Sequence, residues 1–372
     1  MFDPRITQLA DVLVNYSAAV QAGENLLLEA IDVPAEFTAE VVRLVKAAGG
    51  RPYVLLKSVA VNRALLLAGT REQWETISEI EAAQMSRMQC YIGARGSPNV
   101  SELSDVSSDQ QKLYENTVWK RVHHEIRVRK TRWVVTRWPN SSMAQLAQMS
   151  TPAFEDFYFK VCTLDYRRMA AAMQPLKKRM ESTDRVRLKG PGETDLAFSI
   201  RGIPAVACEG RRNIPDGEVF TAPQRESIQG VIQFNAPTLY RGVTHENVRL
   251  VFKDGRIVQA TSSATGKLNE VLDTDAGARY TGEFAIGFNP HVTRPMKDIL
   301  FDEKIAGSIH LTPGACYDEA SNGNKSDIHW DLVLIQTPEH GGGELWFDDT
   351  LVRKDGRFVV PDLAPLNPER LV

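Results

Sequence analysis

Two side chains that can bind a metal ion stand two residues apart in the stretch SDIHWDLVLI, residues 326–335. His329 and Asp331 precede the apolar run 332–335, whose composition predicts a buried strand. Residues i and i+2 of a strand point to the same face, so the imidazole and the carboxylate are expected to lie together at one edge of a sheet. This arrangement is the geometry of a chelate.

Three further stretches of the second half place a possible metal ligand beside small or turn-forming residues. They are NIPDGEVFTAP (213–223, with Glu218), TGEFAIGFNP (281–290, with Glu283) and GSIHLTPGACYDE (307–319, with His310 and Tyr317). Each alone is more typical of a turn or core residue. Together with His329 and Asp331 they offer carboxylates and imidazoles, which suit zinc, cobalt, manganese or iron. The absence of clustered cysteines argues against a closed structural zinc site, so the pattern favours an open, catalytic metal site.

Length and composition define the class of protein. With 372 residues, 43% of them hydrophobic and 24% charged, the chain is typical of a soluble globular protein of two domains. A net charge of −3 argues against nucleic-acid binding. The sequence has no apolar run long enough to predict a membrane span and no basic segment of the kind that begins a secretory signal. We therefore expect a cytoplasmic protein. Reduced, structural thiols are expected at the scattered positions Cys90, Cys162, Cys208 and Cys316.

The first half alternates predicted helices and strands. Apolar spacing and glycine positions predict helices at 6–19 and 34–48, and strands at 23–30, 49–56, 91–96 and 131–139. Strand, helix, strand is the parallel crossover unit. The basic stretch 121–137 is interpreted as a strand with one solvated face. No GxGxxG or GxxxxGK[ST] motif is present, so a nucleotide site is not predicted.

After about residue 184 the pattern becomes β-rich. RVRLKGPGETDLAFSIRG predicts a hairpin around a Gly-Pro-Gly turn, and ENVRLVFKDGRIVQATS predicts another around Asp254 and Gly255. The helical segment 152–182 is expected to bridge two domains. The expected fold class is therefore α/β, with an N-terminal α/β domain of parallel strands (1–180) and a β-rich α+β C-terminal metal-binding domain (181–372).

The motifs of the second half carry a family resemblance. PDGEVFTAP, GEFAIGFNP, IHLTPGACY and SDIHWDLV resemble, in sequence and in order, the metal-site motifs of the aminopeptidase T and aminopeptidase S family of metallo-aminopeptidases. The resemblance extends over most of the chain and includes GENLLL, AAGGRPYV, GETDLAFSI and KDGRFV. The second-half motifs are specific, whereas the N-terminal match rests on a general α/β pattern.

The resemblance implies a metal site and an activity. Carried over residue by residue, the metal-site positions of the family fall on Glu218, Glu283, His310, Tyr317, His329 and Asp331. The implied cofactor is a pair of divalent metal ions, Zn, Co or Mn. The implied activity is hydrolysis of N-terminal residues from small peptides by a metal-activated water. The family also implies a homodimer and a catalytic domain that is distinct from the N-terminal α/β domain.

Amide hydrolysis at neutral pH needs a strong nucleophile, which a divalent metal supplies by lowering the pKa of bound water to about 7. An exopeptidase must also bind the free amino group of its substrate. The charged residues near the motifs are expected to serve turns or helix caps, and no general base is assigned; these residues are Asp216, Asp318, Glu319 and Asp327. Asp327 is a candidate for orienting a ligand histidine through its second ring nitrogen.

A second reaction class fits part of the same set. His310, His329 and Asp331 form the two-histidine, one-carboxylate triad that binds Fe(II) in non-haem oxygenases. The alternative is therefore a ring-cleaving dioxygenase of the dihydroxypyridine type, since such enzymes are similar in fold to this aminopeptidase family. The peptidase is favoured because a mononuclear iron site does not need the remaining candidates, Glu218, Glu283 and Tyr317. A binding or scaffold protein would be expected to have lost ligands, and none is lost.

Overall fold

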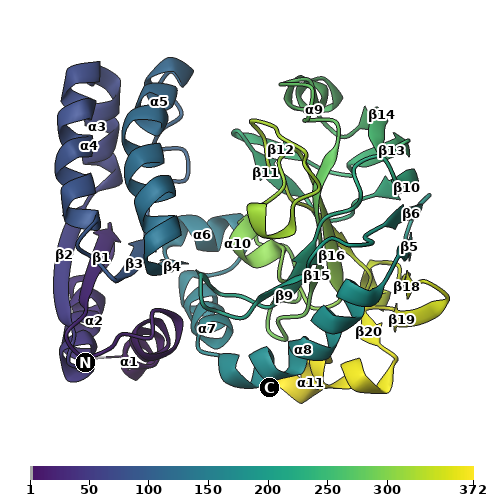
Figure 1. Ribbon diagram of the computed structural model, residues 1–372, viewed down its shortest axis with the longest axis horizontal. Helices are drawn as coiled ribbons and strands as arrows, with labels where there is room; N and C mark the ends of the chain where they lie inside the picture. Colours follow the sequence, from purple (N-terminus) through teal and green to yellow (C-terminus); the bar gives the residue numbers. More distant parts are fainter. Residues whose placement is uncertain (1–2) are drawn as a thin grey trace. The chain divides into compact units, whose positions relative to one another are not determined.

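A computed structural model describes residues 3–372, and Figure 1 shows their secondary structure. The residues group into two compact units: the first comprises residues up to 163 together with 210–214, and the second comprises 164–209 and 215–372. Helix α8 (Tyr166–Ser182), expected to be part of a bridge, belongs to the second unit. The functional domain boundary expected near residue 180 stays a prediction. Within residues 3–372 no helix is both long and apolar enough to cross a membrane.

The first unit is built on a five-stranded sheet in the order β2-β1-β3-β4-β8. Every neighbouring pair is parallel, so the connections must cross over, and helices provide them. The strands are β1 (Asn25–Ile31), β2 (Arg51–Lys57), β3 (Cys90–Arg95), β4 (Arg132–Arg137) and β8 (Asn213–Ile214). The helical segments are α1 (Pro4–Asp11), η1 (Val12–Ser17), α2 (Ala35–Ala47), α3 (Val59–Ala68), α4 (Arg71–Met85), α5 (Ser108–Tyr114), η2 (Glu115–Val128), α6 (Ser141–Leu146) and α7 (Thr151–Cys162). The expected parallel α/β arrangement is confirmed.

The π-helical segment η2 corrects one interpretation of the sequence. The stretch 121–137 was expected to form a strand, but its first part is helical and only Arg132–Arg137 is a strand. η2 buries Val118, Val122 and His123, and spacings of four and five residues are those of a helix face. The local alternation of apolar and basic residues resembles a strand over a shorter distance, which explains the error.

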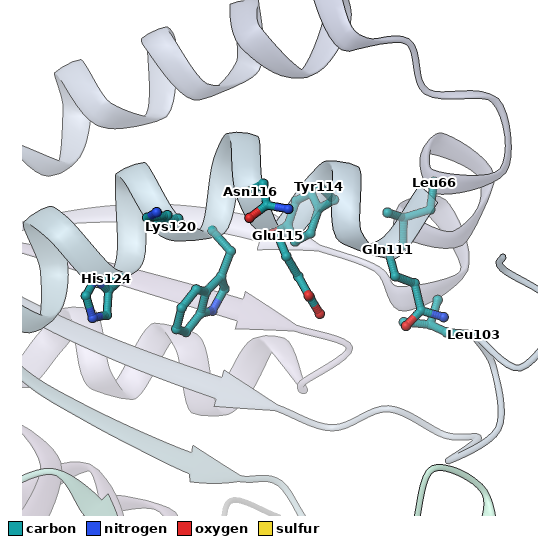
Figure 2. Close-up of a pocket in the computed structure, with 9 residues that line it drawn as sticks. Leu66, Leu103, Gln111, Tyr114, Glu115, Asn116, Lys120 and His124 are labelled. Atoms are coloured by element: carbon teal, nitrogen blue, oxygen red, sulfur yellow. The ribbon is translucent and has the colours of Figure 1, made fainter. Parts of the chain in front are cut away.

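A pocket of about 560 Å³ lies in the first unit, beside η2 (Figure 2). Its wall combines apolar and aromatic side chains with a few charged ones: Leu66, Leu103, Gln111, Tyr114, Glu115, Asn116, Trp119, Lys120 and His124. Within residues 3–372, three groups of side chains can hold a metal ion, and none of their members lines this pocket. The site predicted from the sequence must therefore be sought in the second unit.

The second unit consists mainly of antiparallel sheets. One has the order β14-β13-β10-β6-β5-β18-β19-β20, another the order β17-β16-β15-β9-β7, and a short third pairs β11 with β12. The strands are β5 (Arg185–Lys189), β6 (Asp195–Ser199), β7 (Val206–Cys208), β9 (Glu218–Thr221), β10 (Gln229–Gln233), β11 (Thr238–Tyr240), β12 (Val243–His245), β13 (Arg249–Lys253), β14 (Arg256–Thr261), β15 (Thr281–Gly287), β16 (Ser308–Pro313), β17 (Leu332–Ile335), β18 (Glu344–Phe347), β19 (Thr350–Lys354) and β20 (Arg357–Phe358). Besides α8, its helical segments are α9 (Thr265–Leu272), α10 (Ile299–Asp302), η3 (Asp318–Ala320), η4 (Pro338–His340), η5 (Pro361–Leu366) and α11 (Pro368–Leu371). The β-rich character expected of the second half is confirmed.

The sheet containing β15 and β16, which we call the inner sheet, has four strands in which every residue is buried: β9, β15, β16 and β17. One face of the inner sheet packs on the sheet that contains β6. Phe284 of β15 contacts Phe198 of β6 with ring centroids 5.0 Å apart and the rings at 70°, an edge-to-face arrangement that stabilises aromatic pairs. This contact identifies the face of β15 that belongs to the hydrophobic core.

A charged network is buried in the first unit. Glu29 of β1 is 6% exposed, and its carboxylate lies 2.9 Å from Lys57 Nζ and accepts a 2.5 Å hydrogen bond from the Tyr91 hydroxyl. Burial opposes ionisation of Glu29, but the charges of Lys57 and His123 and these hydrogen bonds outweigh it and lower the pKa of Glu29 to about 2. The carboxylate therefore stabilises the folded chain.

We predict that Glu29→Gln makes unfolding easier near neutral pH by about 3 kcal/mol. Folding lowers the pKa of Glu29 from 4.5 to about 2, so this stability is present above the unfolded value and is lost as the pH falls through the folded one. The difference between wild type and variant, measured by urea unfolding, should shrink over that pH range. Glu81→Gln, which removes the more exposed partner of Lys57, is the control. A difference that is constant with pH would contradict the assignment.

Candidate metal centre

The register of the inner sheet places the candidate ligands on one face. Glu218 pairs with Gly287, and His310 pairs with Ala285. Since side chains alternate along a strand, Glu283, Ala285 and Gly287 of β15 share one face, and the cross-strand pairs bring Glu218 and His310 to that same face. It lies opposite to the face that carries Phe284.

Asp331 and His329 reach the same region from the entrance to β17. Val333 pairs with His310, so Asp331, two residues earlier, extends along the face that carries His310. His329 lies just outside the strand, where it forms a bridge with Gly314. The strands β9, β15 and β16, which lie side by side in the second unit (Figure 1), and the entrance to β17 thus supply five of the six predicted site residues.

The side chains of these five residues converge. His310 Nε2 lies 2.9 Å from Glu283 Oε1, and His310 Nδ1 lies 3.7 Å from Glu218 Oε2. His329 Nε2 lies 3.4 Å from Asp331 Oδ1 and 3.6 Å from Glu283 Oε2. Glu283 therefore stands between the two imidazoles, with one carboxylate oxygen directed to each.

Tyr317 occupies a more peripheral position than the other five. Its ring lies 4.7 Å from the ring of His329 and 5.6 Å from the ring of Phe220, measured between centroids, and the residue is 48% exposed. Desolvation and then the negative charges of Glu283 and Asp331 raise the pKa of Tyr317 well above its usual value. The phenol thus lies within the electric field of the cluster, at its open side.

Polar contacts fix the orientation of two members. The Thr312 hydroxyl, on the same face as His310, donates a 2.5 Å hydrogen bond to Asp331 Oδ1. His329 Nδ1 lies 2.8 Å from the carbonyl oxygen of Ala315. A carbonyl oxygen only accepts, so Nδ1 carries a proton, and Nε2 is the ring nitrogen left to face the carboxylates and to bind a metal ion. The expectation that Asp327 orients a histidine is not met for His329, because a backbone carbonyl takes that place.

The electrostatics of the cluster show a shortage of positive charge. Burial disfavours the charged form of His310, but the hydrogen bond to Glu283 and the charge of Glu218 outweigh it and raise the pKa of His310 to about 9. Burial likewise opposes protonation of His329, but Asp331 and then Glu283 raise its pKa to about 10. Carboxylates that attract protons this strongly onto imidazoles would also attract a cation.

A lysine that the sequence analysis did not select lies in the same cluster. Lys304 is fully buried. Its Nζ lies 2.5 Å from Glu218 Oε1, 2.6 Å from Glu303 Oε1 and 3.5 Å from Asp216 Oδ1. Burial disfavours its charge, but Glu218, Glu303 and Asp216 together raise the pKa of Lys304 well above its usual value. The ammonium is therefore retained at neutral pH.

The contacts of Lys304 give two acidic residues a role that the sequence analysis did not predict. Asp216 was expected to serve a turn; it is 1% exposed and pairs with Lys304. Glu303 was not considered, because FDEK at 301–304 has the composition of a solvated charged turn. Burial and the charge of Glu218, opposed by Lys304, raise the pKa of Glu303 to about 8. Nothing in the local sequence pattern distinguishes these residues from ordinary surface charges.

A glycine allows the lysine-bearing segment to lie against the inner sheet. A Cβ at Gly287 would stand 2.7 Å from the carbonyl oxygen of Ile305 and 2.8 Å from that of Glu303, closer than real side chains approach. Just beyond, the Asn289 amide donates a 2.9 Å hydrogen bond to the carbonyl oxygen of Lys304. The backbone of Lys304 is thus held beside the end of β15, which directs its side chain to Glu218.

The donor set fits a divalent metal ion. Glu218 Oε2, Glu283 Oε2 and His310 Nδ1 are buried and accept or donate no hydrogen bond to the protein, a costly arrangement unless another partner is bound. Among the described residues, three groups can hold an ion: Glu283–His310–Asp331, Glu218–Glu303–His310 and Cys208–Asp216–Glu218. Nitrogen and oxygen ligands of this kind suit zinc, cobalt, manganese or iron.

The chain belongs to a class of metalloproteases. The family model for thermophilic metalloproteases (M29) matches residues 2–358, so the chain belongs to that family. Aminopeptidase T of Thermus thermophilus is 34% identical over 202 residues, which cover 46% of this chain and 48% of that relative. The matched part of the chain thus spans about half the length of that relative.

Two solved structures share the fold. Wild-type AmpT from Thermus thermophilus superposes with a TM-score of 0.76 and 21% identity, covering 97% of this chain and 100% of the other. A 2,5-dihydroxypyridine dioxygenase from Pseudomonas putida KT2440 gives a TM-score of 0.64 and 12% identity, covering 96% and 98%. At these identities the two likenesses concern the fold alone.

We predict that Thr312→Val weakens Zn²⁺ binding by about tenfold or more, because Asp331 loses the hydroxyl that orients it. The affinity is measured by competition with a chromogenic chelator. Thr221→Val is the matched control: this threonine is also buried in the inner sheet, but its hydroxyl bonds to the carbonyl oxygen of Pro204. Equal affinities of wild type and Thr312→Val would remove Thr312 from the centre.

Proposed function

We propose that the chain is a metal-dependent aminopeptidase that hydrolyses N-terminal residues from small peptides. The observation that carries the proposal is the convergence of Glu218, Glu283, His310, His329 and Asp331, with buried carboxylate and imidazole atoms that lack protein partners. Membership of the M29 metalloprotease family supports the use of metal and the hydrolytic class. The name of the Thermus relative supports an exopeptidase in particular.

The proposed ligands are the six residues Glu218, Glu283, His310, Tyr317, His329 and Asp331, and the family resemblance implies two divalent ions, Zn, Co or Mn. A divalent ion at this position would supply the chemistry by lowering the pKa of water and polarising the scissile carbonyl. The residues of the chain supply the binding geometry. Ala315 fixes the tautomer of His329, and Thr312 holds Asp331. These contacts position the donors before a substrate arrives, which reduces the reorganisation needed during reaction.

Two finer assignments also belong to the proposal. They are the homodimer, which the resemblance implies, and the cytoplasmic location, which the sequence analysis predicts. Light scattering coupled to size exclusion would measure the assembly directly, and a monomer at micromolar concentration would end that part of the proposal.

One observation favours a second candidate function. Lys304 contacts Glu218, one of the carboxylates assigned to metal in the peptidase. His310, His329 and Asp331 then remain as two imidazoles and a carboxylate, the set that binds Fe(II) in ring-cleaving oxygenases. The fold likeness to a dihydroxypyridine dioxygenase agrees with this candidate. Family membership and the partnerless oxygen of Glu283 rank it below the peptidase.

We predict that Glu283→Ala lowers peptidase turnover by about 100-fold or more, the scale expected when a group that stabilises the transition state is removed. Glu283 stands between both imidazoles, so its loss removes donors to any ion held there. Release of free amino acid from a dipeptide is the assay, and near-ultraviolet circular dichroism checks the fold. Glu270→Ala, an exposed glutamate of α9 paired with Lys267, should leave the rate unchanged. A Glu283→Ala enzyme with the wild-type rate would exclude the residue.

The two candidate functions predict opposite results in a single comparison. The purified chain is loaded separately with Zn²⁺, Co²⁺, Mn²⁺ and Fe²⁺ and given either an aminoacyl chromogen or a dihydroxypyridine. We expect amino-acid release with at least one of the first three ions, and no oxygen consumption with Fe²⁺. Oxygen uptake on the hydroxylated pyridine without peptidase activity would reverse the ranking.

A further inference from the structure

Lys304 competes with metal for most of the acidic side chains of the centre. Of the three groups of possible ligands in residues 3–372, two draw their carboxylates from Asp216, Glu218 and Glu303. Lys304 Nζ lies within 3.5 Å of an oxygen of each of these three residues. An ammonium group has three N–H donors, so a full set of acceptors surrounds it.

The third group does not contact Lys304. Glu283, His310 and Asp331 can hold an ion together, and His329 Nε2 approaches both carboxylates at 3.6 and 3.4 Å. In the described part of the chain, Glu283 and Asp331 form ion pairs with imidazoles, and neither pairs with a lysine or an arginine. An imidazole that gives up its proton becomes a metal ligand, whereas a lysine ammonium excludes a metal from the oxygens that it binds.

Lys304 is held among the carboxylates by burial and by its backbone contacts. Its side chain has no exposed surface, and its backbone carbonyl is bonded to Asn289 beside Gly287. Moving the ammonium away would leave Glu218 and Glu303 buried without a positive partner. A dication placed among the same carboxylates would meet a fixed positive charge at short range, which is repulsive at the low effective dielectric of a protein interior.

We propose that Lys304 occupies one of the two cation positions, so that the centre binds a single divalent ion held by Glu283, His310, His329 and Asp331. This inference rests on the proposed metal-dependent function and changes the expected ion count from two to one. Glu218 is then the acceptor of the Lys304 ammonium through Oε1 instead of a metal ligand. Its Oε2 lies 3.7 Å from His310 Nδ1, so its negative charge lies beside the ring nitrogen opposite to Glu283.

The test counts metal ions in the full chain. Wild type, Lys304→Met and Lys304→Arg are each loaded with excess Mn²⁺, freed of loosely bound ion by gel filtration, and measured by mass spectrometry. Methionine keeps the length of the side chain without its charge, and arginine keeps the charge. We expect one ion per chain in the wild type and Lys304→Arg, and two in Lys304→Met. Two ions in the wild type, or one in Lys304→Met, would overturn the inference.

A spectroscopic measurement on the wild type alone covers the case in which Lys304→Met fails to fold. One bound Mn²⁺ gives the hyperfine pattern of an isolated ion in electron paramagnetic resonance, whereas two neighbouring ions give a spin-coupled spectrum. The isolated pattern supports the inference and the coupled spectrum overturns it. Peptidase assays on the same samples separate the two proposals: one ion without amino-acid release keeps this inference and removes the proposed function, and two ions with release do the reverse. No bound ion at all would overturn both.

Discussion

The backbone pairing of β15 with β16 determines which side of the inner sheet each ionisable residue faces. Because Ala285 lies opposite His310, Glu283 and His310 stand on one side while Phe284 packs against Phe198 on the other. A shift of one residue in this pairing would exchange the two sides of β16 and turn His310 into the aromatic core. Burying a polar side chain such as His310 in the aromatic core without partners is unfavourable. The hydrophobic core and the polar cluster therefore enforce the same register.

Charge balance explains why the cluster includes a lysine. Asp216, Glu218 and Glu303 lie close together within the fold, and their mutual repulsion must be compensated. Buried ion pairs contribute little net stability, because desolvation offsets most of the attraction. The value of Lys304 therefore lies in holding these acidic side chains in place. Because the ammonium of Lys304 belongs to the chain, this positive charge is present at the centre whether or not metal is bound.

The sequence predicted the parts of the site that depend on short-range spacing. His329 and Asp331 are two residues apart before an apolar run, and that spacing alone placed them on one face of a strand. Glu218, Glu283 and His310 were found through motif resemblance, because their convergence depends on sheet order, which no local pattern reveals. Lys304 and Glu303 were missed because a charged tetrapeptide after an apolar segment has the same composition whether it is solvated or folded inward. The helical η2 was mistaken for a strand because its basic and apolar residues alternate locally.

The missing side chain at Gly287 has a consequence that extends beyond packing. Its open α-carbon lets a second stretch of backbone touch the sheet, and that stretch carries the one ammonium of the centre. A single methyl group added there would push a positive charge outward rather than merely crowd the interior. The position of the positive charge at the centre thus depends on a residue that carries no charge itself.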